Sequence, residues 1–389
     1  MSTSDAGGTA LTKTLTKLLR GVLVLLLFLF LLTELSYLHR GYDRMMRFYG
    51  LKRNSVDAAV IGTSTTFTAY MPMEAYGERG IASCVAATNM QFENTLKYTV
   101  REVRKRQNPR LMVIDVMPFL RAHYAGTDAW NPGDRDLNIR YNVDSLPHGA
   151  ARFRLISEIC RGFGLGPDRV FYYCFDPIRY HLNRPDLVRF HNAVKDPARG
   201  FQHLQKEGGV EFRKADMPED RGQELPLPEA EEKNLRDLLA VLAEDAGIAG
   251  QSGPAGHTGA AGQSGSAGDA GCRVVFCCPP VFLDTEEQIG QKNYLRRILP
   301  EAGYEFWDLT EEREAAGLLA EEDYRDPVHF DSLGSLKTTA LLTERIAAAA
   351  ELPDRRGDPA WGDWNEALAQ WKDLRGGYLA VDTAAVGHN

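Results

Sequence analysis

Two polar groups far apart in the chain have the residue types of a general base and a nucleophile. Asp326 precedes His329 by three residues in the sequence Asp-Pro-Val-His. A carboxylate at this spacing can reach the imidazole, set its tautomer and stabilise the imidazolium that forms when histidine takes a proton. Ser64, in Ile-Gly-Thr-Ser-Thr, is the candidate nucleophile. Taken singly, Ser64 could instead cap the next helix, and His329 could be a loop histidine beside a helix cap.

A third segment supplies candidate donors for an oxyanion, the negatively charged oxygen of a tetrahedral intermediate. It reads Ala-Ala-Thr-Asn-Met-Gln from Ala86 to Gln91. The backbone N–H of Ala87 and the side chain of Asn89 fit this role, and Gln91 competes with Asn89 for it. The segment could equally cap the following helix, and both roles are compatible because helix N-termini attract anions.

Other polar residues are weaker candidates. Asp115 ends an apolar stretch and could face the site or be structural. A further polar group could contact a substrate or form a solvated loop: Arg135, Asn138, Arg140 and Asn142. No histidine or cysteine set has the spacing of a metal site, so neither a metal nor another cofactor is expected.

The elements that must position these residues alternate between strand and helix. The expected strands are Val56–Gly62, Leu111–Val116, Arg273–Phe276 and Tyr304–Leu309, with one more before residue 86. The expected helices are Gln91–Arg106, Glu229–Asp245, Glu286–Glu301 and Ser332–Ala350. This order predicts an α/β fold with a parallel sheet covered on both faces, and such sheets bind ligands at the carboxyl ends of their strands.

Three segments fall outside that alternation. Residues 119–228 have weak periodicity and form an expected insertion with some helix at Ala151–Cys160. Residues 247–271 carry glycine at every third position, which is the collagen period. With one proline in so short a run, a flexible loop is the preferred interpretation. The tail 351–389 contains three tryptophans that could pack on the domain or on a membrane surface.

The N-terminal segment predicts a membrane anchor. The stretch Leu18–Leu38 contains an unbroken apolar run, Val22–Leu32, and Arg20 can extend it by reaching toward the surface. No small-residue cleavage site follows, which argues against a signal peptide. The expected organisation is a cytoplasmic tail (1–17), an anchor (18–38), a juxtamembrane segment (39–54) and one domain (55–350).

Charge limits the classes of function and does not orient the anchor. The 53 acidic and 45 basic residues give a formal net charge of −8, with no basic stripe, so a nucleic-acid partner is not expected. Basic residues flank the anchor on both sides: Lys13, Lys17 and Arg20 before it, and Arg40, Arg44, Arg47, Lys52 and Arg53 after it. This count leans slightly against an outward C-terminus, and a cytosol-facing domain stays an alternative.

Taken together, the three motifs resemble the SGNH (GDSL-like) hydrolase family. The resemblance is closer to its membrane-anchored cell-envelope acyl-transfer members, such as the D-alanyl-lipoteichoic acid transfer protein. It rests on Gly62-Thr63-Ser64, on Val85 to Gln91 and on Asp326 through Lys337, and it covers roughly residues 20–350 without the glycine-repeat loop. Thr63 stands where an aspartate is usual before the serine, and Ala87 stands at the usual glycine.

The resemblance implies a three-layer α/β/α sandwich with a flavodoxin-like sheet and a catalytic set of Ser64, Asp326 and His329. It implies a serine esterase or O-acyltransferase that acts on an acylated glycan or envelope polymer outside the cytoplasmic membrane, alongside a membrane O-acyltransferase partner. The alternative, favoured by Thr63 and Ala87, is a non-catalytic assembly or binding factor of the same fold for such a partner.

Overall fold

The computed structural model describes residues 5–36, 45–121, 131–180, 196–204, 214, 217–245 and 271–386. The glycine-repeat loop predicted at 247–271 lies outside these ranges except for Gly271. Residues 39–44 of the predicted juxtamembrane segment also lie outside them.

The fold is α/β and contains a five-stranded parallel sheet in the order β2-β1-β3-β4-β5. Its strands are β1 (Ala58–Gly62), β2 (Ser83–Ala87), β3 (Leu111–Asp115), β4 (Arg273–Cys278) and β5 (Glu305–Asp308). The predicted strands and their parallel arrangement are therefore confirmed, with end positions that differ by one or two residues. Because all five strands are parallel, their carboxyl ends meet at one edge of the sheet.

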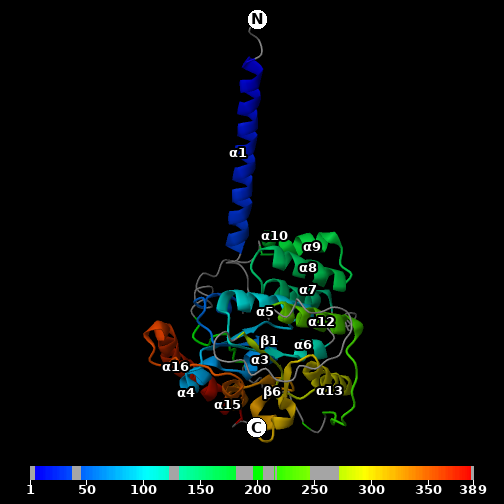
Figure 1. The fold of residues 1–389 in the computed structure, drawn as a ribbon, viewed down its shortest axis with the longest axis vertical. Helices are drawn as coiled ribbons and strands as arrows, with labels where there is room; N and C mark the ends of the chain where they lie inside the picture. The colour runs from blue at the N-terminus through cyan, green and yellow to red at the C-terminus, as the bar shows by residue number, and fades with distance from the viewer. Residues whose placement is uncertain are drawn as a thin grey trace.

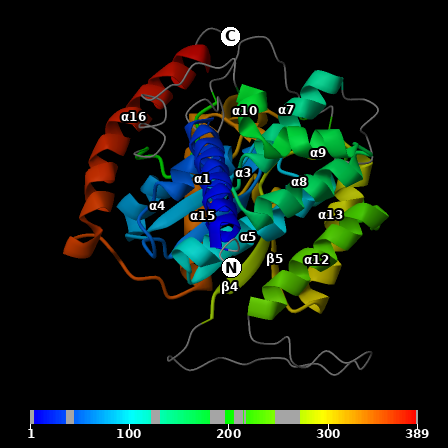
Figure 2. The same ribbon diagram turned by 90° about the horizontal axis from the view of Figure 1, so that it is seen from above.

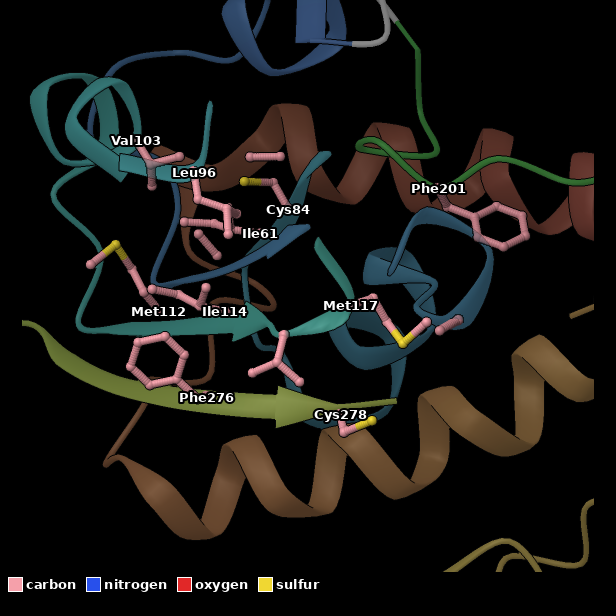
Figure 3. Close-up of a cluster of buried hydrophobic side chains, with 14 of the residues drawn as sticks. Ile61, Cys84, Leu96, Val103, Met112, Ile114, Met117, Phe201, Phe276 and Cys278 are labelled. Atoms are coloured by element: carbon pink, nitrogen blue, oxygen red, sulfur yellow. The ribbon is translucent and has the colours of Figure 1, made fainter. Parts of the chain in front are cut away.

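Both faces of the sheet are buried, as expected for parallel strands. Along β1, Ala59 and Ile61 belong to one apolar core, whereas Ala58 and Val60 belong to the other. The first core includes side chains of α5 (Glu93–Gln107), α12 (Glu229–Asp245) and α13 (Glu286–Glu301). Figure 3 shows Leu96 and Val103 of α5 in this core. The second includes side chains of α3 (Ser64–Ala69), α4 (Pro72–Arg79) and α15 (Ser332–Ala349). The apolar periodicity that predicted α5, α12, α13 and α15 is thus the periodicity of their buried faces.

The insertion predicted at 119–228 contains more helix than its weak periodicity indicated. Its helices are α7 (Pro132–Val143), α8 (Ala150–Gly162), α9 (Pro167–Cys174) and α10 (Asp176–Tyr180). They enclose a small core of their own, in which Leu155, Ile159 and Tyr173 are buried with Phe92 of the main domain. We call α8, α9 and α10 the helical platform. Short helices bury few residues each, so their periodicity is hard to detect in the sequence.

The C-terminal tail packs on the domain. Helix α16 (Gly362–Val386) follows a short 3₁₀ turn, Pro359–Trp361. The indoles of Trp361, Trp364 and Trp371 are buried in the first core, which decides between the two alternatives left by the sequence. The remaining elements are α2 (Met45–Tyr49), α6 (Met117–Leu120), a 3₁₀ turn (Leu309–Glu312), α14 (Ala320–Asp323), β6 (Tyr324–Asp326) and β7 (His329–Phe330).

The N-terminal helix α1 (Asp5–Ser36) projects away from the domain (Figures 1 and 2). Its stretch Thr12–Leu32 has a mean hydropathy of 2.4 and is long and apolar enough to cross a membrane. None of this stretch is buried inside the protein, so it is not a core helix of the described domain.

Candidate active site

Ser64 lies at the carboxyl edge of the sheet, at the point where β1 turns into α3. It is the first residue of α3, and Thr63 is the N-cap, whose hydroxyl accepts a hydrogen bond from the Thr65 N–H. The turn requires glycine before it, because a Cβ on Gly62 would lie 2.1 Å from the Thr66 hydroxyl oxygen and 2.4 Å from the Asp115 Cβ. The capping role that competed for Ser64 therefore belongs to Thr63, and the Ser64 hydroxyl is available for another partner.

That partner is His329, 265 positions away in the chain. The Ser64 Oγ lies 2.8 Å from the His329 Nε2, and the His329 Nδ1 lies 2.7 Å and 2.9 Å from the two Asp326 carboxylate oxygens. A carboxylate only accepts hydrogen bonds, so the Nδ1 of the neutral imidazole carries the proton and the Nε2 accepts from the serine. The three residues named from their sequence spacing are therefore joined in one hydrogen-bonded chain.

The segment that carries Asp326 and His329 is a short antiparallel hairpin rather than the loop expected from the sequence. Strands β6 and β7 pair Asp326 opposite His329. The backbone N–H groups of Val328 and His329 also donate to the Asp326 Oδ1, each at 3.0 Å. Partial burial of Asp326 opposes its ionisation. The hydrogen bond from His329, the charge of His329 and the two backbone N–H groups outweigh that effect, so the pKa of Asp326 lies below its usual range. The carboxylate thus stays ionised beside the imidazole.

The hairpin is held by an aromatic contact beneath it and by the start of α15. The Tyr324 and Phe330 rings are 4.7 Å apart, and both side chains are buried. Asp331, next in the chain, caps α15 by accepting from the N–H groups of Leu333 and Gly334. The polar residues after His329 in the sequence motif therefore fix the direction in which the chain leaves the hairpin.

Of the three predicted oxyanion donors, the structure leaves Asn89 the freest. Its side chain is half-exposed and has no hydrogen-bond partner among the residues that the structure describes. Gln91 is buried, and its Nε2 donates to the Thr99 hydroxyl at 3.2 Å, which turns the amide into helix α5. Ala87 ends β2 opposite Gly62. The Thr88 N–H donates to the Gly62 carbonyl, and the Val85 N–H donates on the other side of β2 to the Arg199 carbonyl. Because N–H groups alternate in direction along a strand, the Ala87 N–H points away from β1 and Ser64, contrary to the role expected from the sequence.

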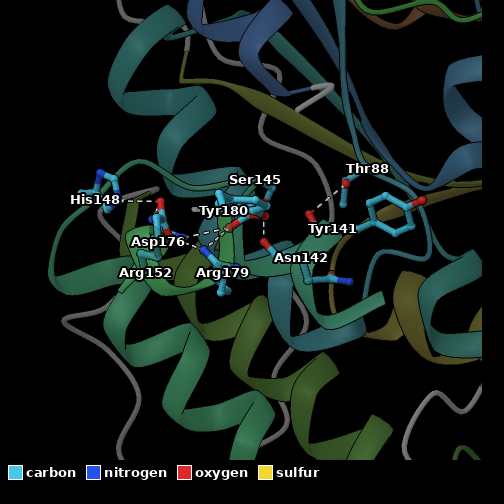
Figure 4. A network of polar contacts seen from close by, with 10 residues as sticks. Thr88, Tyr141, Asn142, Ser145, His148, Arg152, Asp176, Arg179 and Tyr180 are labelled. Atoms are coloured by element: carbon cyan, nitrogen blue, oxygen red, sulfur yellow. Dashed lines mark hydrogen bonds and ion pairs between the residues drawn. The ribbon is translucent and has the colours of Figure 1, made fainter. Parts of the chain in front are cut away.

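Asn142 holds the turn that carries Asn89. Its Nδ2 donates to the Met90 carbonyl at 2.8 Å, and its Oδ1 accepts from the Phe92 N–H at 2.7 Å and the Thr95 hydroxyl at 2.9 Å. The neighbouring Tyr141 carbonyl accepts from the Thr88 hydroxyl (Figure 4). The sequence left two roles open for Asn142, contact with a substrate or a place in a solvated loop. Asn142 is fully buried, so it has neither role.

We expect Asn142→Ala to lower the free energy of unfolding by about 2–4 kcal/mol, because it leaves the Phe92 N–H and the Met90 carbonyl buried without partners. Thermal unfolding of the purified chain in detergent measures this. Asn138→Ala, one turn earlier on α7, is the matched control, since only the Asn138 carbonyl bonds to Asn142. Equal loss in both variants would show that Asn142 does not support the turn.

Asp115 supports the nucleophile turn from below. Its Oδ2 accepts from the hydroxyls of Thr66 at 2.7 Å and Thr63 at 3.2 Å, and its Oδ1 accepts from the Met117 N–H at 2.8 Å. Burial raises the pKa of Asp115, and these donors oppose the rise. The sequence left open whether Asp115 faces the site or is structural. These contacts are those of a structural residue. Thr63 thereby gains a function of its own at the position where an aspartate is usual.

Arg121 belongs to the same neighbourhood and was not singled out from the sequence. Burial lowers the pKa of its guanidinium, while the carboxylates of Asp115, Asp284 and Asp326 attract it and oppose that shift. Its hydrogen bond within the described part of the chain is to the Met90 sulfur, at 3.5 Å. The sequence could have indicated Arg121 by its position, since it lies six residues after Asp115, the last residue of β3.

A cavity of about 610 Å³ adjoins the hairpin on the β4–β5 side. Phe282, in its wall, donates its backbone N–H to the Pro327 carbonyl between Asp326 and His329. Its wall combines apolar side chains with charges of both signs, and Lys292 pairs there with Asp220 at 2.8 Å. Across the described ranges, no group of three or more His, Cys, Asp or Glu side chains could hold a metal ion.

The chain of Ser64, His329 and Asp326 has the geometry needed to deprotonate a hydroxyl: a nucleophile within reach of a base, and a base oriented by a carboxylate. Comparisons of the chain with protein-family models, with curated proteins and with solved structures found no significant match.

Proposed function

We propose that this chain is a membrane-anchored serine esterase or O-acyltransferase that works through an acyl-enzyme. The observation that carries the proposal is the hydrogen-bonded chain from Ser64 through His329 to Asp326, with distances of 2.8 Å and 2.7 Å. This chain joins segments 265 positions apart and aligns a hydroxyl, an imidazole and a carboxylate in the order that activates a nucleophile.

In the proposed reaction the Ser64 Oγ attacks the carbonyl carbon of an ester, and its proton passes to the His329 Nε2. The Asn89 amide, with the backbone N–H of Ser64, receives the negative oxygen of the tetrahedral intermediate. As the carbon–oxygen bond to the leaving alcohol breaks, His329 returns the proton to that oxygen. A water or sugar hydroxyl then releases the acyl group by the same steps in reverse.

The fold assignment that accompanies this proposal is a three-layer α/β/α sandwich with a flavodoxin-like sheet. It is supported by the strand order β2-β1-β3-β4-β5 and by the two apolar cores on opposite faces of the sheet. The site lies at the carboxyl edge after β1, between β2 and β3, where the strand order reverses and such sheets bind ligands. Membership of the SGNH family is proposed on the same grounds, together with the three motifs.

The substrate class and the place of action rest on the resemblance and on α1. We propose acyl esters of an envelope polysaccharide or related polymer as substrates, a membrane O-acyltransferase as partner, and a single-pass anchor with the domain outside the cytoplasmic membrane. The apolar stretch Thr12–Leu32 supports the anchor.

Fluorophosphonate labelling tests the chemistry, because the reagent bonds to a serine oxygen only when a base activates it. We expect covalent labelling of the wild-type chain in detergent, and mass spectrometry should locate the adduct on the peptide that contains Ser64. Ser64→Ala should remain unlabelled, and Thr65→Ser, which offers a second serine hydroxyl beside the first, should gain no second adduct. A wild-type chain that resists the reagent would favour the non-catalytic binding factor.

Topology is tested separately. An alkaline phosphatase reporter fused after Asn389 should be active in a bacterial host, because the enzyme folds only in an oxidising compartment. The matched control is the same fusion with Lys13, Lys17 and Arg20 replaced by glutamine, which should reduce reporter activity by removing the positive charges that retain the N-terminus inside. An inactive reporter on the wild-type fusion would place the domain in the cytosol.

A further inference from the structure

The helical platform contacts the anchor at the level where its apolar stretch ends. Helix α10 packs against α1, and both views show α10 beside the domain end of α1 (Figures 1 and 2). Among the described side chains of α1, only Leu29 and Leu32, near its domain end, are partly buried. Leu32 is also the last residue of the stretch that can cross a membrane. Any element packed beside these two leucines therefore lies at the boundary of the bilayer.

The platform exposes three large apolar side chains. Outside α1, six large hydrophobic side chains of the described chain are exposed, and three of them belong to the platform: Phe153 (56% exposed) on α8, Phe171 (61%) on α9 and Ile178 (40%) on α10. Exposed apolar groups gathered in one region indicate a surface that another phase or partner covers. The Phe171 ring also stacks on Phe175 at 5.9 Å, which gives the platform an aromatic pair.

The exposed side chains do not result from loose packing of the platform, because a core and an ionic network of its own hold its helices in place. Arg152 and Arg179 are fully buried and pair with the carboxylates of Asp144 and Asp176 (Figure 4). His148 adds a contact to Asp176 at 2.9 Å. A packed apolar core and a buried ionic network fix the helices, so the exposed phenylalanines are presented outward by a rigid scaffold.

We infer that the helical platform lies on the membrane, with Phe171 and Ile178 at the depth of the lipid head groups. Aromatic side chains are favoured at that depth, and exposed Arg154 and Arg161 on α8 can contact lipid phosphates. This inference rests on the anchor proposed above and extends it, because one helix alone leaves a domain free to tilt, whereas a second contact fixes its orientation.

The contact reaches the candidate site through a continuous stretch of four residues. Asp144 bonds to the platform arginines. Tyr141 and Asn142 hold the turn of Asn89. The platform and the turn of the proposed oxyanion donor are therefore connected through residues 141–144.

Depth-dependent fluorescence quenching tests the inference on the full-length chain. A fluorescent amino acid is inserted by amber suppression at position 171, 25 or 319, and each protein is reconstituted in vesicles of phosphatidylcholine and phosphatidylglycerol. Nitroxide lipids, labelled near the head-group end of the acyl chain, serve as quenchers. Leu25 lies within the anchor. Leu319 is the matched control, because it is 49% exposed and precedes α14 and β6, and β6 lies at the end of the domain opposite to α9 and α10 (Figure 1).

We expect emission at position 171 to fall about twofold or more with nitroxide lipid, since interfacial side chains sit about 5–10 Å into the boundary. Emission at position 25 should also fall, and emission at position 319 should not change. Quenching at 25 with none at 171 would overturn this inference and leave the anchor standing. No quenching at 25 would overturn the anchor itself, and equal quenching at 171 and 319 would deny that the platform is the membrane-facing surface.

Discussion

His329→Ala should lower kcat for ester hydrolysis by about 10⁴- to 10⁶-fold while the chain stays folded. The imidazole is the only group that contacts both the Ser64 hydroxyl and the Asp326 carboxylate among the described residues, so its removal leaves the nucleophile without a base. It is partly exposed, at 19% for its side chain, and its loss should not open a large cavity. Hydrolysis of an activated aryl ester, followed by absorbance in detergent, measures the effect.

His148→Ala is the matched control for this variant. His148 also pairs with a carboxylate, Asp176, at 2.9 Å, and lies in the helical platform rather than at the Ser64 turn. Its loss should leave kcat within about twofold, because it supplies no proton transfer at the site. Parallel loss of activity in both variants would mean that the effect is general unfolding, and full activity of His329→Ala would exclude this histidine as the base.

Asp326→Asn should lower kcat on the order of 10⁴-fold with little effect on KM. The asparagine keeps the Oδ1 that accepts from the N–H groups of Val328 and His329. Its amide, however, donates to the His329 Nδ1 and forces the proton onto the Nε2, which then faces Ser64 as a donor rather than an acceptor. The same ester assay, run with a fluorophosphonate titration of active sites, measures the change.

Asp284→Asn is the control, since it removes an exposed carboxylate from the surroundings of Arg121 and leaves the hydrogen-bonded chain intact. Its kcat should stay within about threefold of wild type, as expected for a surface charge. If Asp326→Asn kept the activity of Asp284→Asn, Asp326 would not determine the tautomer, and the site would work as a Ser–His pair.

The pH dependence of Asp326 follows from the direction of its shift. Its pKa is lowered in the folded protein, so the stability it contributes is fully present above the unfolded value of about 3.9 and is lost as pH falls through the folded value. Thermal unfolding should therefore show the advantage of wild type over Asp326→Asn declining below about pH 4. An advantage that disappeared between pH 7 and 5 would contradict the lowered pKa.

Local patterns in the sequence determined much of this fold. Helices α12 and α13 have the predicted bounds, because their apolar faces are long enough for the 3.6-residue period to be visible. The pairing of Asp326 with His329 is also local, since three residues of chain keep them within reach of each other. The short helices α9 and α10 escaped prediction because each buries too few residues to set a period.

The tertiary structure alone decided which distant groups meet. The order β2-β1-β3-β4-β5 brings Ser64 to His329, and no pattern in either segment encodes that 2.8 Å distance. It also turned the Gln91 amide into helix α5, where the amide donates to the Thr99 hydroxyl, and left the Asn89 side chain half-buried, because the direction of an amide depends on the helix that packs beside it. The sequence by itself determined the residue types of a serine–histidine–aspartate site and a candidate anchor. Their meeting, and the platform beside the anchor, depend on long-range packing that local periodicity does not record.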